Sequence, residues 1–173
     1  MALTKIISGG QTGVDCGALD AALVAGFECG GWCPADRSAE DGEIPERYPL
    51  TPLAIDKVWK TSQVREARQV AEQYRARTLK NVQDSDGTVI LYSGTLSGGT
   101  LLTQKLCMRE KMPVMALDAQ AITRLRAAGA ITKFVEEHGI SVLNVAGPRL
   151  SGRKSWPSSR CFARTARMWS GLQ

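Results

Sequence analysis

The feature that most constrains the fold is a glycine-rich turn between an apolar strand and a helix, close to the N-terminus. The run Lys5-Ile6-Ile7-Ser8-Gly9-Gly10-Gln11-Thr12-Gly13-Val14-Asp15 leads into Gly17-Ala18-Leu19-Asp20-Ala21-Ala22-Leu23. Glycines let the backbone bend sharply and allow another group to come close. A helix that begins in such a turn directs unpaired N–H groups and the positive end of its dipole at the loop. We therefore predict an anion site here, with a plain ligand-free turn as the alternative.

Apolar runs and helical stretches alternate along the rest of the chain, which predicts right-handed crossovers and a parallel sheet. The 173 residues suit a single domain, 1–173, that is large enough to bury a core. We expect a three-layer, doubly wound α/β fold with a mainly parallel sheet. The expected strands after the first are 28–34, 88–92, 113–117 and 141–146, and the expected helices are 65–74, 77–82 (a short turn), 100–110, 121–138 (with a break at Gly129) and 157–169.

Residues 35–53 form a long polar stretch with several prolines. A loop of this length inside a compact domain is usually functional or disordered. Its tyrosine and spaced prolines favour an ordered surface lid.

Polar, glycine-containing loops follow three of the expected strands, at 8–13, 97–100 and 147–149. In open parallel sheets, ligands bind beyond the carboxyl ends of the strands. We therefore expect these three loops to face one shared crevice.

Several familiar chemistries are excluded by motif. The first loop is neither GxGxxG nor a P-loop, which gives no support to an ordinary NAD dehydrogenase or ATPase. The single histidine, His138, stands alone, so no catalytic triad can be assembled. The five cysteines include no CxxC pair, and no histidine lies near Cys29 and Cys33 to complete a zinc site. We therefore assign no catalytic residues and no protein-held metal.

Some polar and aromatic residues admit two interpretations each. Asp15, on the first turn of the expected helix, either caps the helix or binds a ligand amine. Trp32 either stacks on a flat heterocycle or covers the core. One of Asp84 and Asp86 serves as a turn residue before the strand at 88–92.

The net charge of +5 is unevenly spread, since residues 149–167 hold six basic side chains and no acidic one. This stretch is either an anion-binding surface or a solvated face. Aromatic residues are not interleaved with the basic ones, which disfavours nucleic acid as a partner. No run approaches the ~20 apolar residues that span a membrane, and no signal-peptide pattern is seen, so we expect a cytoplasmic location.

Taken together, these motifs resemble the molybdenum-cofactor carrier protein family, which is related to the Rossmann-like LOG (lysine-decarboxylase-like) group. The resemblance covers most of the chain in order. It is carried by residues 7–15, 17–23, 30–34, 39–42, 44–45, 48–50, 81–82, 84–88, 97–100 and 143–149.

This resemblance implies a Rossmann-like, cytoplasmic homo-oligomer that binds molybdenum cofactor (molybdopterin) or a related phosphate-bearing ligand, with molybdoenzymes as recipients. A helix N-terminus suits the phosphate, and pterin edges are matched to Asn81 or Asp86. The candidate ligand-binding residues are Gly9, Gly10, Gln11, Thr12, Gly13, Asp15, Trp32, Asn81, Asp86, Ser97, Gly98, Gly99, Thr100, Gly147, Pro148 and Arg149.

The chain departs from that family at Cys16, where a basic residue is expected, and at Leu79-Lys80, where Glu-Trp is commoner. Two other functions remain open. A LOG-like nucleoside-monophosphate phosphoribohydrolase carries the loop Gly-Gly-x-Gly-Thr-x-x-Glu, but the stretch from Gly98 to Gln104 lacks its glutamate, so an enzyme is the less favoured interpretation. A module that senses a nucleotide derivative fits the same glycine loops.

Overall fold

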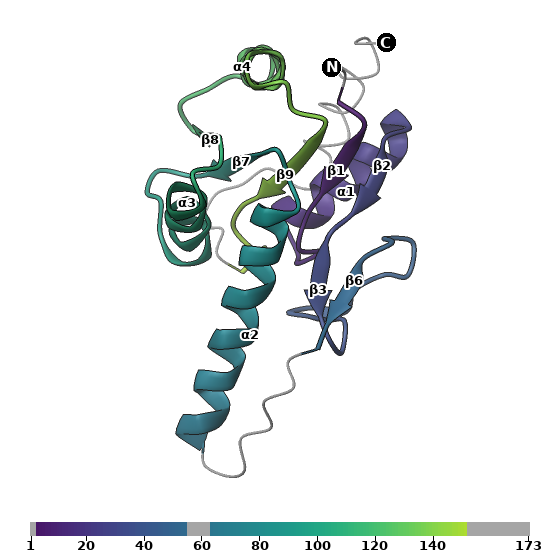
Figure 1. The fold of residues 1–173 in the computed structure, drawn as a ribbon, viewed down its shortest axis with the longest axis vertical. Helices are drawn as coiled ribbons and strands as arrows, with labels where there is room; N and C mark the ends of the chain where they lie inside the picture. The colour runs from purple at the N-terminus through teal and green to yellow at the C-terminus, as the bar shows by residue number, and fades with distance from the viewer. Residues whose placement is uncertain (1–2, 55–62, 152–173) are drawn as a thin grey trace.

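The computed structural model describes residues 3–54 and 63–151 and has a five-stranded sheet at its centre, in the order β2-β1-β9-β7-β8 (Figure 1). Every neighbouring pair in this sheet is parallel. The predicted α/β fold with a mainly parallel sheet is confirmed. Its strands are β1 (Lys5–Ile7), β2 (Glu28–Gly30), β7 (Gly87–Tyr92), β8 (Val114–Asp118) and β9 (Val142–Ala146).

The order of the strands identifies where a ligand should bind. The last strand, β9, lies in the middle of the sheet, between β1 and β7. Numbering the strands from β7 makes β7, β8, β9, β1 and β2 strands 1 to 5. Their order across the sheet is then 2-1-3-4-5, which is that of flavodoxin-like doubly wound folds. In that order the switch in direction falls between β7 and β9. The crevice beyond the carboxyl ends of these two strands is therefore the expected ligand position.

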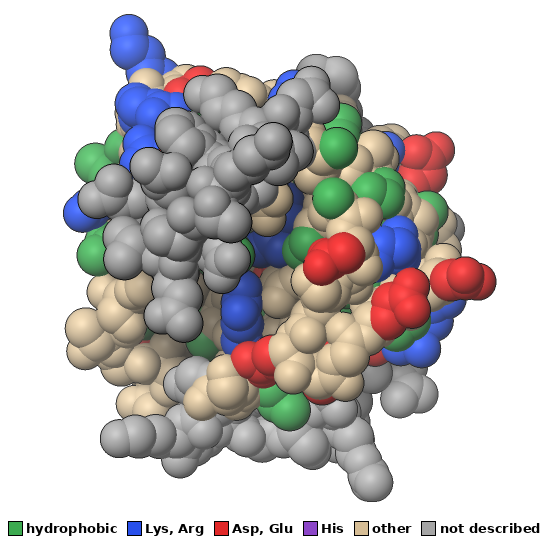
Figure 2. Space-filling view, turned by 90° about the horizontal axis from the view of Figure 1, so that it is seen from below, with side chains coloured by type: hydrophobic (Ala, Val, Ile, Leu, Met, Phe, Trp, Pro, Cys, Tyr) green, Lys and Arg blue, Asp and Glu red, His purple; other side chains and the backbone are tan. Residues whose placement is uncertain are grey.

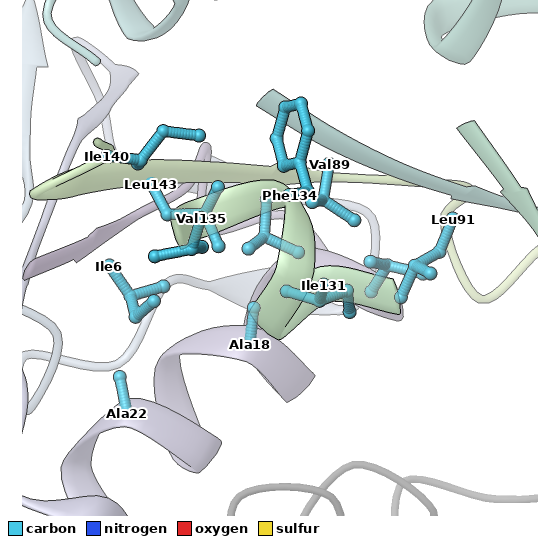
Figure 3. Close-up of a cluster of buried hydrophobic side chains, with 12 residues drawn as sticks. Ile6, Ala18, Ala22, Val89, Leu91, Ile131, Phe134, Val135, Ile140 and Leu143 are labelled. Carbon is cyan, nitrogen blue, oxygen red and sulfur yellow. The ribbon is translucent and has the colours of Figure 1, made fainter. Parts of the chain in front are cut away.

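Two helices cover each face of the sheet, which gives three layers. On one face, α1 (Val14–Ala25) and α4 (Arg124–His138) contribute to the main core together with the strands. Figure 3 shows this cluster, in which Ala18 and Ala22 of α1 lie on the same side as Ile131 and Phe134 of α4. On the other face, α2 (Gln63–Gln83) packs against α3 (Gly98–Glu110). Small side chains on α1 let it approach the sheet closely.

Three predicted boundaries are wrong. Residues 65–82 form one helix, α2, rather than a helix and a separate turn. The helix α4 is unbroken at Gly129, where an added Cβ would meet no atom within 4 Å. The expected strand 28–34 is divided into β2 and β3 (Trp32–Pro34) at Gly31. Gly31 has φ +123°, and an added Cβ would lie 2.2 Å from the Ser8 carbonyl oxygen, so only glycine fits this position.

The stretch 35–53 is ordered, but part of it belongs to the core rather than to a surface lid. It forms the hairpin β4 (Ser38–Ala39) and β5 (Gly42–Glu43), and β6 (Thr51–Leu53), which pairs with β3. Ile44, Tyr48 and Leu50 are buried in a second apolar cluster with Leu19. The Arg37 guanidinium donates to four backbone carbonyls of this stretch, which fixes its path.

No helix in the described part of the chain is long and apolar enough to cross a membrane. The helix expected at 157–169 and most of the basic stretch that ends at residue 167 lie outside the described residues.

Candidate functional site

A crevice made of three adjacent hollows lies at the carboxyl edge of the sheet, and all three are lined by Tyr74 and Arg149. The first is a deep cavity of about 30 Å³ between the first loop, α2 and β9. The second, of about 280 Å³, lies beside β3 and β4 and is called the β3 compartment. The third, of about 730 Å³, lies at the start of α3 and is called the α3 compartment. In Figure 2 this face shows basic side chains deep in a central hollow.

Two arginines contact the aromatic ring of Tyr74 on α2. The Cζ atom of Arg77 is 4.8 Å from the centre of the Tyr74 ring, and that of Arg149 is 5.3 Å from it. Both distances are typical of cation–π contacts. The ring also reaches the start of α3, because an added Cβ on Gly99 would lie 2.1 Å from the tyrosine hydroxyl. The Tyr74 ring thus connects two positive charges to the start of α3, and Arg149 lines the compartment there.

The deep cavity contains a buried charge pair. Arg77 is 5% exposed, and its Nε atom is buried without a hydrogen-bond partner among the described residues. Burial lowers the pKa of Arg77. Burial also raises the pKa of Asp15 to about 6, although the charge of Arg77, the Gln11 amide and the charge of Arg149 oppose this rise. At neutral pH Asp15 is therefore mostly ionised, although burial disfavours its charge, and it partly compensates the positive charge of Arg77.

Much of the first glycine loop faces the protein rather than the crevice. An added Cβ on Gly10 would lie 2.3 Å from Leu50 Cδ1, and one on Gly13 would lie 2.5 Å from the Pro148 carbonyl oxygen. That same carbonyl accepts a hydrogen bond of 3.4 Å from the amide of Val14, the first residue of α1. The first loop lines the deep cavity through Gly9, Gln11 and Asp15.

A carboxylate joins the first loop to the loop after β9. Glu40 accepts hydrogen bonds from the hydroxyl groups of Thr12 and Ser151, and from the Ser151 amide at 3.0 Å. These hydrogen bonds, led by that from the Ser151 hydroxyl, lower the pKa of Glu40 to about 2. The Leu150 amide also donates to Thr12 Oγ1 at 3.1 Å. The two loops are therefore held together at the wall of the crevice, where Glu40 lines the β3 compartment and Ser151 lines the α3 compartment.

The other two predicted loops meet as expected. All of Ser97, Gly98, Gly99 and Thr100 line the α3 compartment. The loop 147–149 lines the same compartment. Because Ser97 is the N-cap of α3, the unpaired amides and the positive end of the helix dipole are located here.

The remaining predicted residues have structural partners. Asn81 lines the deep cavity, but its amide group bonds both the N–H (2.8 Å) and the carbonyl (3.1 Å) of Trp32. The Trp32 indole N–H donates to Asp84 at 2.6 Å, and Trp32 lines none of the three hollows. Asp86 precedes β7 at the opposite edge of the sheet, where its carboxylate accepts from two amides at the start of β9 (3.0 and 2.8 Å).

Sequence reasoning missed the helix α2 and the strand interior as sources of crevice residues. Along α2, spacings of three and four residues place Tyr74, Arg77, Thr78 and Asn81 on one face, a signal that was hidden by dividing the helix in two. Asn144 is a buried polar residue inside the apolar strand β9, and its Nδ2 donates to Thr88 at 3.2 Å. A lone asparagine in an otherwise apolar strand is the sequence signal that could have identified Asn144 as a crevice residue.

The described residues contain no cluster of three His, Cys, Asp or Glu side chains that could hold a metal ion.

A three-layer parallel α/β domain with a basic crevice at its switch point belongs to the Rossmann-like ligand-binding class. Within this class, residues 6–160 match the circularly permutated YpsA SLOG family (cpYpsA), and the chain belongs to that family. The permutation agrees with a last strand that lies in the middle of the sheet.

A solved structure from Syntrophus aciditrophicus SB, of a protein named "Putative molybdenum carrier protein", is similar over almost the whole chain. It has 37% identity and a TM-score of 0.81, with 97% of this chain and 95% of that chain covered. Among curated proteins, none matches significantly. The similarity to the molybdenum carrier group, first indicated by the sequence motifs, is thereby confirmed.

Proposed function

We propose that this protein binds and carries a small anionic ligand that bears a phosphate and is related to molybdenum cofactor. The observation that carries the proposal is that Arg77 and Arg149 both contact the Tyr74 ring, whose hydroxyl lies at the start of α3. Arginine and helix N-terminal amides are the groups that proteins use to bind phosphate. The similarity to a protein named as a molybdenum carrier supports the same role.

The α3 compartment suits the phosphate. Its lining includes Arg149 and the first residues of α3, and among the described residues it includes no aspartate or glutamate. An anion there meets no opposing carboxylate, and the helix dipole favours its charge. Arg77, which lines the adjoining deep cavity together with Gly99, adds a second positive charge beside this compartment. The donors present therefore fit a phosphate-bearing cargo.

We favour binding over catalysis because the stretch from Gly98 to Gln104 lacks the third glycine, the spacing and the glutamate of the LOG catalytic loop. In this proposal the protein is a cytoplasmic homo-oligomer, it hands its cargo to molybdoenzymes, and its own residues leave the ligand unchanged. A co-purifying cargo would establish its identity. We expect native mass spectrometry of protein from its own host to show a pterin phosphate with molybdenum. A nucleotide derivative in its place would favour a sensing module instead.

The anion site itself is tested by calorimetry with ribose 5-phosphate. Arg149→Gln removes one of the two charges beside Tyr74, and we expect the affinity to fall about tenfold or more, since a charge-assisted hydrogen bond contributes roughly 1.5–3 kcal/mol. The control is Arg124→Gln, which removes the same charge from the exposed start of α4. If ribose 5-phosphate does not bind, or if both variants bind it as the natural protein does, the proposal is wrong.

A further inference from the structure

The two larger compartments of the crevice differ in charge. Within the part of the chain that the structure describes, no acidic residue lines the α3 compartment, whereas Asp36 and Glu40 line the β3 compartment. An anionic ligand that filled both would place its negative end near α3 and turn a different kind of group toward the carboxylates. Charge complementarity thus gives the ligand a direction.

The geometry points to a ligand in two parts, with its phosphate in the α3 compartment and, in the β3 compartment, a flat heterocycle that presents a ring N–H next to an amino group. Guanine and pterin rings share this edge. The inference rests on the proposed function, since it requires the phosphate end to bind near Arg149.

Arg77 supplies an independent indication that the β3 compartment is built for a ligand. It lines both this compartment and the deep cavity, and it is 5% exposed with its Nε unpaired among the described residues. An unsatisfied buried donor is costly, so its retention indicates a partner other than the described residues. A carbonyl oxygen on a ring in this compartment is such a partner.

The walls of the β3 compartment suit a planar ring. Leu53, Val70 and Pro34 provide apolar surface, and Tyr74 provides an aromatic face. The volume of about 280 Å³ leaves room for a bicyclic heterocycle.

Asp36 is the acceptor best placed to read the ring edge. Its Oδ1 accepts a hydrogen bond of 3.0 Å from the Ser38 amide, which fixes the direction of the carboxylate. The carboxylate of Glu40, by contrast, is already engaged by Thr12 and Ser151. An ionised carboxylate accepts hydrogen bonds and cannot donate them. It therefore favours guanine, whose N–H and amino groups are adjacent, over adenine, which presents a ring acceptor beside its amine.

Calorimetry with GMP, IMP, AMP and ribose 5-phosphate tests the inference, because GMP and IMP differ only in the amino group. We expect GMP to bind about tenfold more tightly than IMP or AMP, as one charge-assisted hydrogen bond allows. Asp36→Asn keeps the Oδ1 acceptor but removes the charge, and it should reduce the preference for GMP over IMP to less than about threefold. Ribose 5-phosphate should bind this variant about as well as the natural protein. Asp41→Asn, exposed between β4 and β5 and outside the crevice lining, is the matched control.

The outcomes separate the two proposals. Equal affinity for GMP, IMP and ribose 5-phosphate would overturn the heterocycle inference and leave the anion site intact. A preference for GMP that survives Asp36→Asn would overturn the assignment of this carboxylate. If no phosphate compound binds, the proposed function and the inference that rests on it both fail.

Discussion

The buried carboxyl of Asp15 should make the stability of this protein depend on pH in a way that one substitution can isolate. Burial raises its pKa from 3.8 to about 6 in the folded state. Below pH 3.8 the group is protonated in both the folded and the unfolded chain, and it imposes no penalty. As the pH rises through about 6, the folded state must carry a buried carboxylate, so stability is lost. At about 1.4 kcal/mol per pH unit, the full loss is about 3 kcal/mol.

Asp15→Asn removes this titration, and the pKa of about 6 already includes the attraction between the ionised carboxylate and Arg77. The assay is urea unfolding of both proteins between pH 4.5 and pH 7.5. We expect the free energy of unfolding of the variant, minus that of the natural protein, to rise by about 2 kcal/mol across this range. Asp41→Asn, which removes an exposed carboxylate, controls for the change in net charge.

The reasoning is refuted if the difference between Asp15→Asn and the natural protein stays constant within about 0.5 kcal/mol over the range. A fall with rising pH would refute it equally, because that result requires an ionised carboxylate that stabilises the fold. The sign of the slope therefore tests whether burial outweighs the charge of Arg77 at this position.

Three further predictions concern the walls of the crevice. Gly99→Ala should displace the Tyr74 ring and weaken binding of ribose 5-phosphate about tenfold by calorimetry, with little change in melting temperature; unchanged affinity would remove the ring from the site. Asn81→Ala leaves the backbone N–H and carbonyl of Trp32 unpaired and should cost about 2–3 kcal/mol in urea unfolding, and a loss below about 0.5 kcal/mol would contradict this. Glu40→Gln should lower stability at pH 7 by less than about 1 kcal/mol, because the group is exposed, and this loss should shrink below about pH 4 as the natural carboxylate becomes protonated. A loss that grows toward acid pH would contradict the role of its charge.

Local sequence patterns were sufficient to predict the layered α/β fold. The apolar run at 88–92 and the glycine turn before α1 predicted a strand and a helix, because backbone sterics and the helix dipole act over a few residues. The alternation of such elements predicted the parallel sheet. The positions of the loops 97–100 and 147–149 after strands predicted that these loops meet at one edge of the sheet. These loops do line one compartment.

Other features depended on contacts between distant parts of the chain. Asp86 was expected to contact the ligand, but its carboxylate bonds amides about 55 residues later at the far edge of the sheet. Gly13 was expected to make room for an anion, but it makes room for the carbonyl oxygen of Pro148, which would lie 2.5 Å from an added Cβ. Neither partner is encoded in the local sequence, since both follow from the insertion of β9 between β1 and β7.

The sequence by itself therefore determined the kind of fold, the edge of the sheet that bears the site and two of the loops that build it. Only the tertiary structure decided which charges face the crevice, because Arg77 and Tyr74 reach it from a helix whose continuity the sequence did not reveal. Strand and turn formation is governed by neighbouring residues. The packing of the layers decides which groups surround Arg77, namely Tyr74, Asp15 and the start of α3.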